Sequence, residues 1–305
     1  MRSASTPPPR GHLTPKIGRV SEPSRRVRIV TDSACDLPDE LVQRHAIGVV
    51  PLSIRFGDEE LIDREQLSVD EFWRRCAATD ELPSTAAPAP GQFEQVFRQM
   101  AAEGADDIVV VSLSGALSAT IQSAELAARE VTESVRVHVV DSRSVTLGLG
   151  TMVLAAARAA EAGTSAADIV ANVTDMASRT RVIGALDTLD NLRKGGRIGG
   201  AKALLATALS IKPIIEVIDG VVEQAGKQRT RSRALAFIVD QVAADADRIE
   251  GLAVLHAECA DVDQFVDMLR AAAPSLDDIV VGHIGPVIGT HAGMGTIGVA
   301  YQRRS

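Results

Sequence analysis

Aromatic side chains are scarce in this sequence, and its excess positive charge is confined to one end. Only 3% of the 305 residues are aromatic, with Trp73 the sole tryptophan and Tyr301 the sole tyrosine. Bases and sugars would therefore find few rings on which to stack. The net charge is −8, yet residues 1–28 carry +6, which leaves −14 on the remainder. An acidic body with few aromatics argues against nucleic acid as the main partner.

Cysteines are also few, and long apolar runs are missing. Cys35, Cys76 and Cys259 are an odd number without metal-site spacing, which fits a reducing cytoplasm. His256 and Cys259 could form half of a metal site, but no second pair accompanies them. No run approaches the roughly 18 apolar residues of a membrane span, and the start of the chain lacks the apolar core of a secretory signal. We therefore expect a cytoplasmic protein with no metal, no cofactor and no transmembrane segment, whose membrane contacts would be transient.

The remaining pattern predicts a short tail and two domains. Residues 1–26 hold five of the 13 prolines, a composition typical of a disordered, basic tail. Strand and helix patterns alternate through residues 27–172, which predicts an α/β domain whose mainly parallel sheet has helices on both faces. Residues 173–305 mix helices, short strands and a hairpin around Asp219-Gly220, so we expect an α+β domain with a mixed sheet. The default ligand site is a cleft between these domains.

Local signals also place individual elements. We expect a single strand over 49–56 and a helix capped by Asp36. The proline-rich stretch 82–91 and the basic, glycine-rich stretch 191–200 read as loops. A helix over 201–209 and short, glycine-punctuated strands over 282–301 complete the prediction. The Gly-x-Gly-x-x-Gly spacing at 293–298 leads into a strand rather than a helix, so we do not interpret it as a dinucleotide site.

The stretch 109–124 carries the strongest functional signal. A buried strand at 108–111 runs into a small, hydroxyl-rich loop that includes Ser114, Ser118 and Thr120, and then into a helix. Unpaired backbone N–H groups and hydroxyls gathered in this way suit a carboxylate or a phosphate. An ordinary helix cap without a ligand explains the same residues equally well. Asp32 and Asp141 end two of the predicted parallel strands, so we expect them at the same edge of the sheet.

Several stretches taken together resemble the DegV family of bacterial two-domain fatty-acid-binding proteins. The matching stretches keep one order along the chain and together cover about residues 27–301. No single stretch identifies the family, but the ordered set is specific. They are Val-Thr-Asp-Ser at 30–33, Val-Val-Pro-Leu-Ser at 49–53, Leu-Pro-Ser-Thr at 82–85, Pro-Gly at 90–91, Leu-Ser-Ala-Thr-Ile-Gln-Ser-Ala at 117–124, Val-Asp-Ser at 140–142, Lys-Gly-Gly-Arg-Ile at 194–198, Lys-Pro-Ile at 212–214 and Gly-Pro-Val-Ile-Gly-Thr-His at 285–291.

The resemblance implies a long-chain fatty acid lying in a tunnel between the two domains. Carried over by position, its carboxylate would meet the hydroxyls of Thr85 and Ser118. Ser114 matches the first of two family serines, and His291 matches a family histidine near the headgroup. The alternatives without a ligand are loop caps for the hydroxyls and a structural histidine bonded to a loop carbonyl.

The resemblance also implies a protein partner. Better-studied relatives present their fatty acid to a separate fatty-acid kinase, which makes an acyl phosphate. Arg197 matches an arginine that serves kinase docking, and with Lys194 and Arg193 we expect it to form an exposed basic patch on a monomer. A solvated loop is the alternative for this patch, and a lipid store without a kinase is the alternative for the protein.

This chain departs from the family pattern around the expected headgroup. The family's Thr-Ser-Gln-Pro-Ser is Thr-Ala-Ala-Pro-Ala at 85–89, and its paired serines are Ser114-Gly115. Ala119 replaces a glycine, and Ile121 replaces the usual tyrosine. Thr85 and Ser118 remain, so we still expect carboxylate binding, with a reduced polar network around it.

An enzyme is the competing class. Ser118 could act as the nucleophile of a hydrolase or acyltransferase, with His291 as base and Asp32 or Asp141 orienting it. The sequence lacks the Gly-x-Ser-x-Gly elbow of many such enzymes. We therefore expect a binding protein rather than an enzyme.

Overall fold

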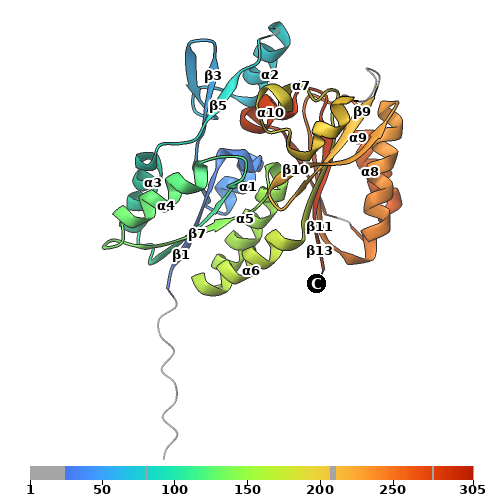
Figure 1. Ribbon diagram of the computed structural model, residues 1–305. Helices are drawn as coiled ribbons and strands as arrows, with labels where there is room; N and C mark the ends of the chain where they lie inside the picture. Colours follow the sequence, from blue (N-terminus) through green and yellow to red (C-terminus); the bar gives the residue numbers. More distant parts are fainter. Residues whose placement is uncertain (1–24, 80, 207–210, 277, 305) are drawn as a thin grey trace, which may run out of the picture.

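The structure, a computed structural model, describes residues 25–79, 81–206, 211–276 and 278–304. Apart from Arg25 and Arg26, the expected tail over 1–26 lies outside these residues. The described chain forms two large sheets side by side, with helices packed between and around them and a small third sheet at one end (Figure 1).

The first large sheet is entirely parallel and comes from the N-terminal half. Its strand order is β2 (Gly48–Val50), β1 (Val27–Asp32), β6 (Asp107–Ser112), β7 (Arg136–Asp141). All of β6 is buried, because helices cover both faces, and this explains its continuous apolar run. One face packs on α3 (Pro90–Ala102) and α4 (Thr120–Glu130), and the other on α5 (Thr146–Glu161) and α6 (Ala166–Arg179). The predicted α/β architecture is confirmed.

The second large sheet is mixed and comes from the C-terminal half. Its order is β10 (Val221–Gln228), β9 (Lys212–Ile218), β8 (Thr180–Ala185), β13 (Ile297–Arg303), β11 (Ile249–His256), β12 (Ile279–His283). The β11–β12 pair is parallel and the other described pairs are antiparallel. The outer face packs on α8 (Arg231–Asp245) and α9 (Val262–Ala272). Asp219 and Gly220 have φ of 49° and 82° in the β9–β10 turn, as a type I′ hairpin requires.

Helix α5 lies between the two sheets and joins their cores. One hydrophobic cluster contains Val109 of the parallel sheet, Leu147 and Met152 of α5, and Val182 and Val217 of the mixed sheet. Glycine permits this close packing, because a Cβ at Gly150 would lie 2.6 Å from the Cys35 carbonyl oxygen. The two halves therefore hold a fixed relation to one another, and a cavity between them has defined walls.

A small antiparallel sheet stands at one end of the molecule (Figure 1). It has the order β4 (Glu59–Ile62), β3 (Ser53–Phe56), β5 (Ser84–Ala86), and it lies near α2 (Val69–Ala78), α7 (Asp190–Lys194) and α10 (Pro286–Ala292). The Trp73 indole N–H donates to the Ile284 carbonyl over 2.9 Å, which ties α2 to the loop before α10. This end of the molecule carries Thr85 and His291.

Several local predictions were wrong. The expected strand over 49–56 is broken at Pro51, because proline has no N–H for a ladder; β2 stays in the large sheet while β3 pairs with β4 and β5. Asp36 does not cap a helix. It has φ of 50° and ends the 3₁₀ turn Ser33–Cys35, and α1 (Asp39–Arg44) starts after Pro38. Residues 84–86 form β5 inside the expected proline-rich loop.

The C-terminal half also differs in three places. The expected loop over 191–200 contains part of α7, and the predicted helix over 201–209 begins earlier, as a 3₁₀ helix over Gly199–Ala206; residues 207–209 lie outside the described chain. Helix α10 interrupts the expected short strands over 282–301. Pro286 at its first turn supplies a preset φ and needs no N–H partner. A 3₁₀ turn over Ala246–Arg248 follows α8.

Candidate functional site

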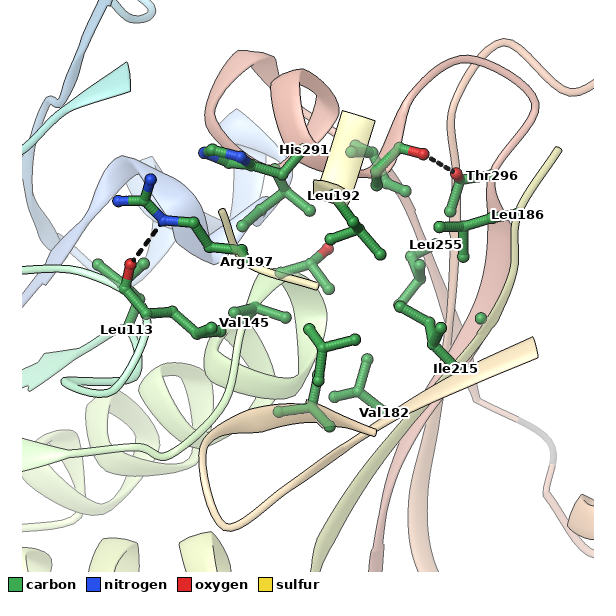
Figure 2. A pocket seen from close by; sticks show the side chains of 18 of the residues that line it. Leu113, Val145, Val182, Leu186, Leu192, Arg197, Ile215, Leu255, His291 and Thr296 are labelled. Atoms are coloured by element: carbon green, nitrogen blue, oxygen red, sulfur yellow. Dashed lines mark hydrogen bonds between the residues drawn. The ribbon is translucent and has the colours of Figure 1, made fainter. Parts of the chain in front are cut away.

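A cavity lies between the two halves, against the face of the mixed sheet that α5 also covers (Figure 2). Most of its lining is aliphatic, including Val182, Leu186, Ile215, Val217, Val222 and Leu255. Six polar side chains also line it, namely Thr85, Ser118, Arg197 and His291, together with Thr146 and Thr296. Figure 2 shows Arg197 and His291 on the opposite side of the cavity from Val182 and Ile215. The cavity thus has a polar end and an aliphatic end.

Thr85 and His291 meet at the polar end. Thr85 belongs to β5 and His291 to α10, and Thr85 Oγ1 lies 3.0 Å from His291 Nε2. The contact joins two elements more than 200 residues apart. It forms because α10 packs beside β3 and β5. The structure therefore brings these two predicted site residues together.

The surroundings of His291 determine whether the ring is charged and which ring nitrogen carries the proton. Burial, with a smaller contribution from the nearby Arg197 charge, lowers the pKa of His291 to about 4, so the ring is neutral at pH 7. Its Nδ1 is buried and has no hydrogen-bond partner within the described part of the chain, and it faces Gly195, where a Cβ would collide with the ring. A buried N–H without a partner costs about 1–3 kcal/mol, which favours the tautomer with the proton on Nε2. Nε2 then donates to Thr85 Oγ1 and leaves the Thr85 O–H to donate into the cavity.

Ser118 has a similar arrangement at the start of α4. Its Oγ lies 2.9 Å from Thr120 Oγ1 and accepts from the Thr120 backbone N–H over 3.3 Å. Thr120 is fully buried, whereas Ser118 is half-buried and lines the cavity. When the Thr120 hydroxyl donates to Ser118, the Ser118 O–H is available to a ligand. The polar end thus holds two hydroxyl donors.

Arg197 supplies positive charge at the same end. The side chain is half-buried; Nε donates to the Leu117 carbonyl over 3.2 Å (Figure 2) and Nη1 to the Gly195 carbonyl over 2.6 Å. No carboxylate of the described chain lies within ion-pair distance of it. A partly buried cation without an anionic partner favours a bound anion. The expected exposed patch is therefore divided: Arg193 and Lys194 are exposed, but Arg197 faces the cavity.

Ser114 does not line the cavity. It is fully buried, and its hydroxyl donates over 2.7 Å to the carbonyl of Gly220 at the tip of the β9–β10 hairpin. A Cβ at Gly220 would lie 2.5 Å from Ser114 Oγ, and the φ of 82° there also favours glycine. Ser114 thus fastens the hydroxyl-rich loop of one half to a hairpin of the other.

The strand-end carboxylates also hold this loop in place. Asp32 accepts from Ser112 Oγ and the Leu113 N–H over 3.0 and 2.8 Å, and Asp141 accepts from the Gly115 N–H over 3.2 Å. Burial raises the pKa of Asp32 to about 6, against the opposing effect of these hydrogen bonds. The predicted gathering of the strand ends is confirmed, but the carboxylates shape the loop and do not line the cavity.

The enzyme alternative requires Ser118, His291 and an aspartate to contact one another in turn, and these contacts are not formed. Ser118 Oγ bonds Thr120, whereas His291 Nε2 bonds Thr85. Asp32 and Asp141 accept from other groups and contact neither residue. Among the described residues, no group of three or more metal-ligating side chains is placed to hold an ion. Within the same ranges, no helix is long and apolar enough to cross a membrane.

The substituted positions lie around the polar end. Ala86 and Ala89, which stand where the family has polar side chains, are exposed, as is Ala119, which stands where the family has glycine. Gly115 and Ile121 touch: a Cβ at residue 115 would lie 3.1 Å from Ile121 Cγ2 and 3.1 Å from Asp141 Oδ2. The isoleucine thus occupies the space that a side chain at 115 would need.

Sequence reasoning named the Thr120 hydroxyl as a possible ligand donor beside Ser118, whereas Thr120 is fully buried and bonds Ser118. Three other features of the site were missed. Gly195, which makes room for His291, and the inward direction of Arg197 depend on how α7 meets α10, and local sequence does not encode that contact. The aliphatic floor depends on which face of the mixed sheet turns inward, which only the strand order determines.

Comparison with known proteins agrees with this architecture. Residues 26–304 match the family model described as an uncharacterised protein of the DegV family. A DegV domain-containing protein of Streptomyces coelicolor is 39% identical over 286 residues, which cover 92% of this chain and all of the relative.

Two solved structures are also similar. One, reported for fatty-acid binding, is a DegV family protein from Thermus thermophilus, with a TM-score of 0.85, 34% identity and coverage of 91% of this chain and 99% of the other. The other is DegV from Bacillus subtilis, described as a fatty-acid-binding protein, with a TM-score of 0.84, 28% identity and coverage of 92% and 100%. The sequence match over nearly all described residues and the shared fold confirm the resemblance, and this chain belongs to the DegV family.

Proposed function

We propose that this protein binds a long-chain fatty acid, with the acyl chain in the aliphatic cavity and the carboxylate at the polar end. Thr85 and Ser118 donate hydroxyl hydrogen bonds to the carboxylate, and Arg197 supplies the opposite charge. His291 holds Thr85 in position. The observation that carries the proposal is an aliphatic cavity whose polar end has two available hydroxyls and a cation with no anionic partner among the described residues.

The energetics assign different roles to the two ends. Burying a methylene contributes about 0.8 kcal/mol, so a chain of about 15 methylenes contributes roughly 12 kcal/mol before losses. Ordering the chain and immobilising the ligand offset a large share of this. A hydrogen bond to a charged carboxylate adds about 1.5–3 kcal/mol. The aliphatic wall thus sets affinity, while Thr85, Ser118 and Arg197 select the headgroup.

The similar solved structures support the same ligand class. Both are described by their binding of fatty acids, and the first exceeds 30% identity over nearly its whole length. The headgroup assignment here rests on this chain's own contacts, since the alanines at 86, 87 and 89 change the surroundings of Thr85.

A titration of delipidated protein with hexadecanoic acid and with its methyl ester tests the proposal. The two ligands have the same acyl chain, but the ester carries no charge and cannot pair with Arg197. We expect the acid to bind at least about tenfold more tightly, the difference of roughly one charge-assisted hydrogen bond. Equal affinities would contradict the headgroup assignment, and absence of binding by both would contradict the proposed function.

We further propose that the protein presents its fatty acid to a separate fatty-acid kinase, which forms the acyl phosphate. Thr85 and Ser118 are only half-buried, so the carboxylate end lies near the surface, and Arg193 and Lys194 are exposed in the same segment as Arg197. Arg193 pairs with Asp190 over 3.2 Å, and Lys194 has no ion-pair partner among the described residues.

Charge reversal at these two positions tests the kinase proposal. An Arg193→Glu, Lys194→Glu variant should keep its fatty-acid affinity but lose phosphorylation of the bound ligand by a bacterial fatty-acid kinase with ATP. Arg270→Glu, on the remote helix α9, is the matched control and should behave as the parent. Phosphorylation of the double variant at the parental rate would reject these residues as the docking surface.

A further inference from the structure

The mixed sheet forms the floor of the cavity. One row of residues across its strands is aliphatic at both ends but has glycines, and so a gap, in the middle. Four strands of the mixed sheet place Leu255, Gly298, Gly184 and Ile215 directly opposite one another. Leu255, Gly184 and Ile215 line the cavity. The next row toward α5 contains Ala253, Ala300, Val182 and Val217, so the gap is confined to the two paired glycines.

The two glycines differ in what a side chain would meet. A Cβ at Gly298 would collide with the Ile183 backbone, so glycine is required there for the strands to approach. A Cβ at Gly184 would be 3.8 Å from both the Ile297 carbonyl oxygen and Leu186 Cδ1, and 4.0 Å from Thr296 Cγ2. These are ordinary contact distances, and Gly184 does not have the positive φ that would require glycine. The backbone therefore tolerates a side chain at 184, and the room above it opens to the cavity.

We propose that Gly184 sets the length of acyl chain that the cavity accepts. The chain crosses the gap at Gly184, and its carbons contact the bare backbone where a side chain would otherwise stand. This inference rests on the proposed function and identifies the part of the ligand that the mixed sheet selects. The direction of the side chain follows from strand alternation, since Val182 and Leu186 on either side of Gly184 also line the cavity.

A graded series at this position tests the inference. Gly184→Ala, Gly184→Val and Gly184→Leu fill the gap progressively, and dissociation constants are measured for saturated acids of 8 to 18 carbons. We expect the longest acids to weaken in the order Ala, Val, Leu, by roughly tenfold or more for leucine, the loss from displacing about two methylenes. The shortest acids, whose chains end before the gap, should bind as they do to the parent.

The matched control is Gly251→Leu. Gly251 also lies in a strand of the same sheet, no atom of the residues that the structure describes lies within 4 Å of a Cβ there, and it does not line the cavity. It should keep the parental affinity for every acid. Thermal unfolding of each variant reports folding, and the alanine variant, whose Cβ meets nothing closer than 3.8 Å, keeps the test valid if the leucine variant fails to fold.

Each outcome decides the inference. A preference that shifts toward shorter acids as the side chain grows supports it. An unchanged length profile, or an equal loss for short and long acids, overturns it while leaving the proposed function intact. A parent that binds none of the acids would overturn the proposed function itself, and this inference with it.

Discussion

The two large sheets contribute to the cavity in different ways. The parallel sheet contributes through the loops at its carboxyl ends, where Asp32 and Asp141 hold the segment that carries Ser118. The mixed sheet contributes one of its faces, a mainly aliphatic surface with a gap at Gly184. Parallel strands direct loop ends to one edge, whereas antiparallel strands present side chains in rows. Under the proposed function, this difference means that the headgroup and the acyl chain are recognised by separate parts of the fold, which can be altered independently.

Replacing the cation should have the largest effect on the polar end. Arg197→Met keeps much of the apolar stem but removes the charge, so we expect fatty-acid affinity to fall by about 2–3 kcal/mol, or roughly 30- to 150-fold. Calorimetric titration measures the loss. Affinity for the methyl ester serves as the control and should change little. A variant that loses acid and ester binding equally would show that Arg197 acts through the fold, through its bonds to Leu117 and Gly195.

Removing one hydroxyl should have a smaller effect of the same kind. Ser118→Ala should weaken fatty-acid binding by about 1–3 kcal/mol and leave the fold intact, because a single hydrogen bond to the carboxylate is lost. The length preference should stay parental, since the mixed sheet is unchanged. An unaltered affinity would remove Ser118 from the site.

Lowering the pH should reduce the stability of the folded protein through protonation of His291 at the polar end of the cavity. The pKa of this ring is about 4 in the folded protein and about 6.5 in an unfolded chain. The unfolded state therefore binds more protons between these values, and the stability contribution is complete above pH 6.5 and lost as the pH falls toward 4. Relative to His291→Gln, the parent should lose about 1–2 kcal/mol of unfolding free energy over this window.

Comparing the parent with His291→Gln removes the contributions of other buried groups, some of which change stability with pH in the opposite direction. Burial raises the pKa of Asp36 to about 7 and that of Asp63 to about 6, so both stabilise the fold as the pH falls, equally in parent and variant. Urea unfolding at several pH values gives the difference. Parallel pH profiles for parent and variant would show that the ring is not held neutral.

The contact between the two halves should give the smallest effect on affinity. Ser114→Ala removes the hydrogen bond to the Gly220 carbonyl, and we expect about 1 kcal/mol less stability together with faster fatty-acid release. Ser178→Ala, whose hydroxyl bonds Asp175 within an exposed helix end, is the control. If the Ser114→Ala variant releases fatty acid at the parental rate, this hydrogen bond does not help to keep the cavity closed.

The fold was largely predictable because its signals are local or periodic. The buried run at 108–111, the alternation of strands and helices, and the Asp219-Gly220 turn each encode their own geometry. The errors fall where a tertiary contact decided the outcome. Pro51 splits a strand between two sheets, and residues after Gly285 become helix α10 because that segment packs against Phe72 and Trp73, with a Cβ at Gly289 only 2.7 Å from both rings.

The candidate site was predictable only in part. Thr85 and His291 came from the family resemblance, Ser118 came from both the hydroxyl-rich stretch and the resemblance, and all three line the cavity. Ser114 and Arg197 also matched family positions, but a positional match does not report the direction of a side chain. Ser114 turns toward the hairpin, and Arg197 turns inward. The gap at Gly184 depends on strand register across four strands, which no local pattern encodes.

Native mass spectrometry of the purified protein, followed by denaturing extraction, tests the central claim most directly. The account predicts one fatty acid per chain, released as a free acid on unfolding, with a length that the Gly184 series then shortens. A protein that carries no lipid, and that takes up no added fatty acid after delipidation, would contradict it.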